Sequence, residues 1–153
     1  MFNQQNYPPT QTFKHGIKID ANCGEVEKCL IDRDLMHQWL NPLLKCEPMG
    51  EWGMELGAKS RFLIELKLWQ PSLTSTVIER NPNLVVWAFE GFFVGCDRWE
   101  WLEQDQQTLL TNTFTFTIPN PLVKFGFNLF AASLTRRDMQ QQLMRFKQVA
   151  ENL

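Results

Sequence analysis

The sequence predicts an α+β fold in which an antiparallel β-sheet packs against one long C-terminal helix. Three observations predict it: a strand pattern with two short helical patterns comes first, a run of strand-like segments fills the middle, and a long helical pattern ends the chain. Strands and helices that are segregated along the chain in this way are typical of α+β proteins. Because the connections between the middle segments are short, these strands can pair only as an antiparallel meander.

Length and composition fit one globular domain. A chain of 153 residues is long enough to bury a sizeable core, and twelve Phe and six Trp against one Tyr suit a dry interior. The net charge of −2 gives no electrostatic basis for binding nucleic acid or an anionic membrane. We expect residues 1–11, which are polar and contain Pro8-Pro9, to form a flexible arm and residues 12–153 to form a single domain.

The expected location is the cytoplasm. The N-terminus has neither the basic region nor the apolar core of a secretory signal, and no segment approaches the ~18 apolar residues of a membrane span. The four cysteines include no C-x-x-C pair, so free thiols in a reducing compartment are favoured over disulfides.

The first third of the chain predicts one strand and two short helices. Apolar and polar residues alternate over 13–19, which indicates a strand with one buried face. Residues 22–25 carry the Asn-x-x-Glu pattern of a capping box and begin a helix. A second helix starts at Asp32 or Asp34 and is stopped by Asn41-Pro42.

Six further segments predict strands, over residues 43–49, 58–69, 73–80, 84–90, 92–103 and 109–118. In the fifth of them, Asp97, Trp99 and Trp101 share one face. The last alternates most cleanly, since four threonines form one face and Leu110, Asn112, Phe114 and Phe116 form the other. The turn at 104–107 has no Asn-Gly pair, so its type stays open. One polar face implies one solvated side, and the apolar side must be covered by the helix.

The C-terminal helix is expected to run without a break from about Pro121 to Asn152. Asn120 and Pro121 form a helix start, and apolar residues then recur at alternating steps of three and four up to Leu153. A coiled coil is disfavoured because the flanking positions carry no complementary charges. The first half, over 122–134, is apolar on all sides and should be buried on more than one side.

The order of these elements and several short motifs resemble the START-like, or SRPBCC, superfamily, whose architecture is called the helix-grip fold. The matching residues are Ile19-Asp20-Ala21, Val26, Asp32, Trp39, Asn41-Pro42, Glu79, Asn81-Pro82, Leu84, Thr108, Leu110, Phe114, Phe116 and the terminal helix. Glu27 stands where the superfamily often has Trp, which marks a subfamily. The chain is most similar to the polyketide cyclase/dehydrase-like group.

This resemblance implies a START-like domain with a cavity between a curved sheet and the long helix, where an apolar or amphipathic small molecule binds. The first half of the helix should line the cavity, while the apolar stripe from Met139 onward packs against the sheet. The candidate ligand-binding residues are Phe62, Trp87, Phe89, Trp99, Trp101, Asn112, Phe114, Phe116, Phe125 and Leu129.

Each of these aromatic residues has core packing as its alternative role. Trp99 and Trp101 are the favoured residues of the cavity wall, because a buried indole N–H needs a partner that a ligand or water could supply. Asn112 is either a structural hydrogen-bonding residue or the polar handle of the cavity, because a buried amide must be satisfied.

No residue pattern predicts a catalytic or metal centre. His37 lies beside the presumed cavity mouth, where simple exposure is favoured over a role as general base. His15 is expected to be a hydrogen-bonded core histidine, and Asp97, near a strand start, is expected to be exposed. Two histidines without clustered cysteines or carboxylates do not make a metal site, and we expect neither a metal nor a cofactor. No paired carboxylates on one face suit acid–base chemistry.

The sequence therefore predicts a protein that binds or carries a hydrophobic or amphipathic small molecule of lipid-, quinone- or polyketide-like character. Affinity would come from apolar burial, with one or two polar groups fixing the orientation. An aromatase/cyclase-type enzyme is the second hypothesis and ranks lower because no proton-transfer residue is evident. A protein–protein module similar to the co-chaperone branch of the superfamily is the third, and an exposed apolar patch would favour it.

Overall fold

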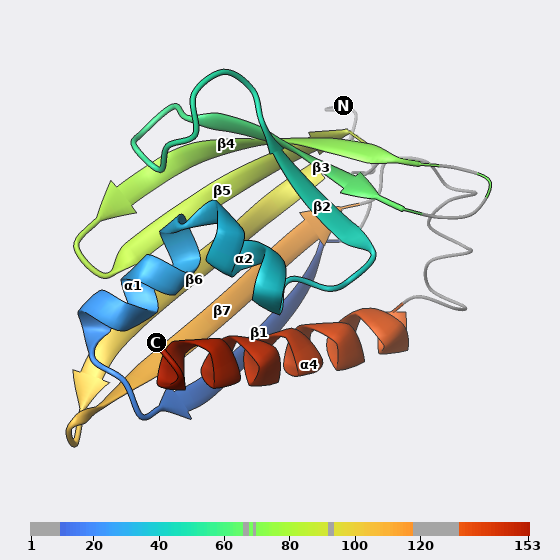
Figure 1. Ribbon diagram of the computed structural model, residues 1–153. Coiled ribbons are helices and arrows are strands. Elements are labelled where there is room, and N and C mark those ends of the chain that lie inside the picture. The colour runs from blue at the N-terminus through green and yellow to red at the C-terminus, as the bar shows by residue number, and fades with distance from the viewer. Residues whose placement is uncertain (1–9, 66–67, 69, 92–93, 118–131) are drawn as a thin grey trace, which may run out of the picture.

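A computed structural model describes residues 10–65, 68, 70–91, 94–117 and 132–153 of the chain. Its centre is a curved sheet of seven strands in the order β1-β7-β6-β5-β4-β3-β2 (Figure 1). All neighbouring strands pair antiparallel, as predicted. The strands are β1 (Gln11–Ile19), β2 (Leu44–Pro48), β3 (Lys59–Ile64), β4 (Ser72–Asn81), β5 (Leu84–Gly91), β6 (Val94–Gln104) and β7 (Gln107–Thr117).

Two short helices follow β1, as the sequence predicts, and are labelled α1 (Cys23–Ile31) and α2 (Arg33–Trp39). The capping box of α1 is present: the Asn22 side chain accepts from Glu25 N at 2.9 Å, and the Glu25 carboxylate accepts from Asn22 N at 3.0 Å. Asp32 is the cap of α2, because its carboxylate accepts from Leu35 N at 3.0 Å.

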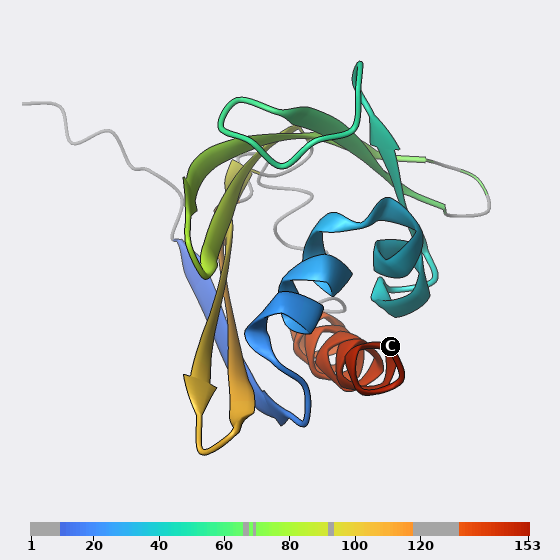
Figure 2. The same ribbon diagram turned by 60° about the vertical axis from the view of Figure 1, so that its left-hand side comes forward.

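The helices lie on the concave side of the sheet. Figure 2 shows the sheet arching over α1, α2 and α4 (Ala132–Glu151). Helix α4 packs on β1 at one edge of the sheet and against α2. Trp39 of α2, Trp99 of β6 and Phe146 of α4 meet in the core, with ring centroids 5.1 to 6.0 Å apart. These three rings join both helices to the middle of the sheet.

Several boundaries differ from the prediction. The first strand begins at Gln11, so this residue belongs to the sheet and not to the predicted arm, whose residues 1–9 lie outside the described part. Strand β3 ends at Ile64 instead of continuing to 69: Ile64 N donates to Pro71 O at 3.0 Å, but Pro71 has no N–H to return the bond. The predicted helix over 121–152 is confirmed for α4, while the predicted start at Pro121 is among residues 118–131, which lie outside the described part.

Two further findings concern the chain as a whole. All four cysteines are free thiols, as expected. Among the described residues, no helix combines the length and the apolar character needed to cross a membrane.

Candidate ligand-binding site

A cavity of about 340 Å³ lies between the concave face of the sheet, α2 and the first half of α4. This volume is at the lower end of the ~300–1,000 Å³ that is typical of small-molecule sites. The apolar lining consists of Met36, Trp39, Leu40, Leu43, Leu44, Phe62, Ile64, Leu73, Trp87, Phe89, Trp99, Phe114, Phe116 and Met139. The polar lining consists of Asn41, Asp97, Asn112, Asp138 and Gln142.

Most of the predicted site residues come together here, because alternate residues of neighbouring strands face the same side of the sheet. The predicted residues in the lining are Phe62, Trp87, Phe89, Trp99, Asn112, Phe114 and Phe116. Their rings form a continuous series: Phe62–Phe89 at 5.6 Å, Phe89–Phe114 at 6.3 Å and Phe114–Phe116 at 5.1 Å between centroids. Phe125 and Leu129 lie outside the described residues.

Trp101 is the exception: the sequence predicts it in the cavity wall, but it is not among the lining residues. It shares a face with Trp99 but lies two residues further along β6, a strand that α1 contacts. There it is fully buried, with the Arg80 guanidinium 5.7 Å from its ring centroid. Its Nε1 atom has no hydrogen-bond partner among the described residues. Trp101 is therefore a core residue next to the site.

Helix α4 contributes both to the core and to the cavity. Leu143, Phe146 and Ala150 are buried, as the apolar stripe predicts. Met139 packs against Phe13 and Phe116 of the sheet, as expected, and it also lines the cavity together with Asp138 and Gln142. The reason is that α4 rests on the edge strand β1 and on α2, and the cavity lies between the N-terminal half of α4 and the central strands.

Asp97 lies inside the cavity, and the expectation that it is exposed to solvent is wrong. Strand β6 begins at Val94, so Asp97 is well inside the strand and pairs with Phe114 of β7. Trp99, two residues along the same face, donates its indole N–H to Asp97 Oδ2 at 2.8 Å. Asn112 faces Trp99 across the strand pair and donates Nδ2–H to Asp97 Oδ1 at 2.5 Å.

Burial determines how this carboxyl group titrates. Desolvation raises the pKa of Asp97 from 3.8 to about 6, although the hydrogen bonds from Trp99 and Asn112 act in the opposite direction. The side chain is half-buried, and its accessible part faces the cavity. A carboxyl group with a pKa near neutrality inside an apolar cavity is a candidate functional group.

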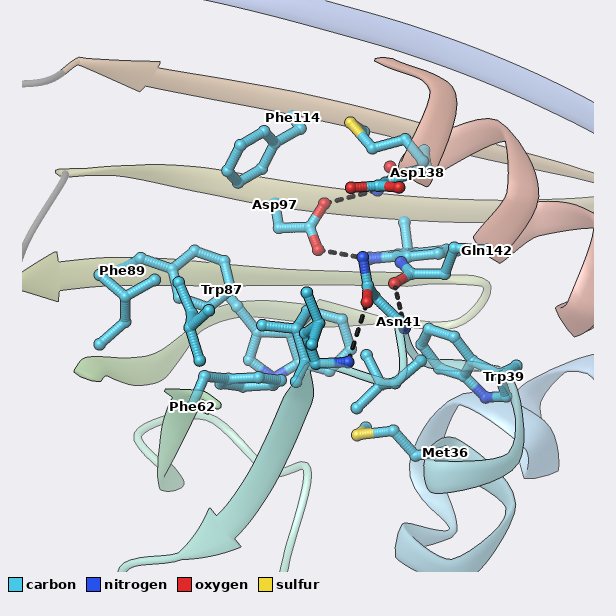
Figure 3. A pocket seen from close by; sticks show the side chains of 18 of the residues that line it. Met36, Trp39, Asn41, Phe62, Trp87, Phe89, Asp97, Phe114, Asp138 and Gln142 are labelled. Carbon is cyan, nitrogen blue, oxygen red and sulfur yellow. Dashed lines mark hydrogen bonds between the residues drawn. The ribbon is translucent and has the colours of Figure 1, made fainter. Parts of the chain in front are cut away.

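The other polar residues come from α4 and from the segment after α2, as Figure 3 shows. Asn41 N donates to Gln142 Oε1 at 3.2 Å, and Asn41 Oδ1 accepts from Leu43 N at 2.9 Å. Asp138 adds a second carboxylate to the lining. The sequence pattern did not reveal this pair of carboxylates because Asp97 and Asp138 lie on different elements. The sequence signal for the second carboxylate was Asp138 itself, a charged residue beside the apolar stripe of the last helix.

Both histidines lie outside the cavity lining. His37 Nδ1 donates to Arg33 O at 2.9 Å, and His37 Nε2 accepts from Cys46 N at 3.1 Å, so the backbone uses both ring nitrogens. His15 is half-buried against α4, and its Nε2 atom has no hydrogen-bond partner among the described residues. Burial lowers the pKa of His15. The expectation that His15 is a hydrogen-bonded core residue is therefore wrong, because α4 covers this part of β1 incompletely.

Within the described ranges, no group of three or more His, Cys, Asp or Glu side chains is arranged to hold a metal ion.

The comparisons with known proteins agree with this architecture. Residues 10–151 match the family described as polyketide cyclase/dehydrase and lipid transport. No curated protein matches the sequence. Similar solved structures include the ZhuI aromatase/cyclase from Streptomyces sp. R1128, with 15% identity, a TM-score of 0.75 and coverage of 94% of each chain.

Two further solved structures are also similar. One is from Thermus thermophilus, with 14% identity, a TM-score of 0.75 and coverage of 92% of this chain and 97% of that one. The other is a putative uncharacterized protein from Rhizobium leguminosarum, with 12% identity, a TM-score of 0.71 and coverage of 95% and 97%. At such identities the likeness shows the helix-grip fold alone. The match over residues 10–151 shows more, and the chain belongs to the polyketide cyclase/dehydrase and lipid transport family.

Proposed function

We propose that the protein binds and carries a hydrophobic or amphipathic small molecule in the cavity under the sheet. The observation that carries the proposal is the composition of the lining, in which five polar residues stand among a larger number of apolar and aromatic ones. A ligand would gain affinity from burial against the rings, and the polar residues would fix its orientation. The family description supports a polyketide- or lipid-like ligand.

Binding of Nile red, a neutral apolar dye, tests this proposal together with native mass spectrometry of the freshly purified protein. Phe62 is half-buried in the lining, so Phe62→Ala should weaken dye binding by about tenfold, at a stability cost below the ~3–5 kcal/mol of a fully packed Phe. Trp101→Phe is the matched control: it changes a buried ring outside the lining and should leave the dye affinity unchanged. If the parent protein binds no dye and retains no small molecule, the cavity is only a packing defect.

An aromatase/cyclase-type enzyme is the second candidate, and Asp97 is the observation that favours it. The sequence hypothesis ranked an enzyme lower because it lacked a proton-transfer residue. A carboxyl group whose pKa is about 6, inside an apolar cavity, is suited to accept a proton from a carbon next to a carbonyl group and to return it to oxygen.

Hydrogen exchange into a ketone separates the two candidates. With 2-tetralone, a two-ring ketone, in D₂O, an enzyme should accelerate deuterium incorporation beside the carbonyl group. Asp97→Asn should lower the protein-dependent rate by about a hundredfold or more, because general acid–base catalysis contributes ~10²–10⁴-fold. Glu103→Gln, an exposed carboxylate on the same strand, is the control. If the ketone binds without protein-dependent exchange, the enzyme hypothesis is rejected and carriage remains.

A further inference from the structure

The charges of the cavity restrict the chemistry of its ligand, an inference that rests on the proposed binding function. Asp97 and Asp138 are the ionisable residues in the described lining, and no Lys, Arg or His is among its members. None of the ion pairs between described residues involves either carboxylate. The polar side of the cavity therefore carries negative charge that no described cation neutralises.

The neighbours of Asp97 on the two adjacent strands and on α4 leave this charge in place. Trp87 of β5 and Phe114 of β7 are its partners across the two strand pairs, and neither is charged. Asn112 is neutral, and from α4 the one charged neighbour in the lining is Asp138, another carboxylate. The adjacent Arg98 is engaged elsewhere, since its guanidinium donates to Glu79 and Glu100.

Asp97 keeps the capacity to accept further hydrogen bonds. A carboxylate offers about four acceptor sites, and two of those on Asp97 receive the N–H groups of Trp99 and Asn112. The accessible part of the side chain faces the cavity, between the aromatic rings and the Asn41–Gln142 pair (Figure 3). A group that enters the cavity and donates a hydrogen bond can therefore use one of the remaining sites.

We propose that this cavity selects a neutral ligand that presents a hydroxyl group, as a phenol or an alcohol does, to Asp97, and that it rejects ligands ending in a carboxylate. A hydroxyl donates to the carboxylate and gains a charge-assisted hydrogen bond in an apolar environment. A ligand carboxylate would instead meet like charge where the effective dielectric constant is low.

Protonation should relax this selection. Below a pH of about 6 the Asp97 side chain becomes neutral and turns from an acceptor into a donor, so the repulsion towards a carboxylate ligand decreases. Asp138 is the other titratable group that faces the cavity, and its replacement must therefore be tested separately.

Displacement of Nile red by three matched compounds tests the inference. 2-Naphthol, 2-methylnaphthalene and 2-naphthoate share a two-ring body and differ in one substituent. Near neutral pH, 2-naphthol should bind most tightly, by about tenfold over 2-methylnaphthalene. 2-Naphthoate should displace the dye only at a concentration at least about tenfold higher than the concentration of 2-naphthol that does so. At about pH 5, where a simple carboxylic acid with a pKa of about 4 is still ionised, the gap between 2-naphthoate and 2-naphthol should narrow.

Variants identify the responsible residue. Asp97→Asn should reduce the difference in affinity between 2-naphthol and 2-naphthoate near neutral pH, and this difference should no longer depend on pH. Asp138→Asn should reduce the difference by a smaller amount. Glu103→Gln should leave the gap unchanged. The pH series on the parent protein gives the same test without a variant, in case Asp97→Asn does not fold.

The outcomes separate this inference from the proposed function. If 2-naphthoate binds as tightly as 2-naphthol near neutral pH, the selection is overturned while binding of apolar ligands stands. If the gap persists unchanged in Asp97→Asn and at low pH, Asp97 is not its cause and the inference is likewise overturned. If neither the dye nor any naphthalene binds, the proposed function itself fails.

Discussion

Asp97 combines two opposing requirements, because a site that holds ligands needs a polar group and an apolar cavity disfavours its charge. The raised pKa of about 6 means that the folded protein binds a proton at Asp97 more tightly than the unfolded chain does. Such a group stabilises the fold fully only at pH values below its unfolded pKa of 3.8, and this stabilisation is lost as the pH rises through about 6.

The sign of this linkage gives a prediction for Asp97→Asn, which cannot ionise. Relative to the parent protein, the variant should gain about 2 kcal/mol in its free energy of unfolding between about pH 4.5 and about pH 8. Urea unfolding of both proteins at the two pH values measures this difference, and the other titrating groups cancel in the comparison. An equal stability difference at both pH values would show that Asp97 titrates as an ordinary exposed carboxyl group.

Where strand alternation alone decides the orientation of a side chain, the sequence is enough to assign it to the side of the sheet that carries the cavity. Phe62, Phe89 and Asn112 are examples, because each lies on the concave side of its strand. The prediction failed for Trp101, which lies in the core, and for Asp97, which lines the cavity instead of facing the solvent, although both residues share a face with Trp99. Which part of that face is covered by α1 and which remains open depends on how the helices cross the sheet, and no periodicity within one strand contains this information.

Among the elements, the β6–β7 hairpin has a turn whose geometry the sequence left open. Asp105 and Gln106 both have positive φ, 53° and 65°, so these two central residues form a type I′ turn. Glycine tolerates this backbone conformation better than glutamine does. Gln106→Gly creates the favoured Asp-Gly pair and should raise the free energy of unfolding by about 0.5–1 kcal/mol.

The same substitution two residues earlier is the control. Gln104 is the last residue of β6 and pairs with Gln107, so Gln104→Gly should lower stability by about 0.5–1 kcal/mol. Thermal and urea unfolding of both variants measure the two effects. Destabilisation of similar size in both would contradict the turn assignment.

Local chemistry explains which elements could be predicted from the sequence. The capping box at Asn22 and the cap at Asp32 use side chains within three residues of the amides that they bind, so a short pattern contains them fully. The end of β3 depends instead on Pro71, which lies opposite Ile64 immediately before β4. The line of α4 across the molecule depends on β1 and α2, which are far from it in the sequence.

At the scale of the whole molecule, the predicted order of elements and the antiparallel pairing are confirmed. They could be predicted because short connections leave antiparallel neighbours as the only solution for β2 to β7. The partner of β1 is not fixed by such a rule. The sequence predicted no partner for this strand, and the structure pairs β1 with β7 along its full length.

The pairing of β1 with β7 sets the order in which the sheet can be completed during synthesis. Strands β2 to β7 each pair with the strand made just before or after them, so this part can assemble as the chain emerges from the ribosome. Gln11 pairs with Phe116 and Ile19 with Thr108, so β1 must wait until nearly the whole sheet has been translated. The covering helix α4 comes later still. Contacts of such sequence separation slow folding, and the first strand to be made is therefore the last to find its place.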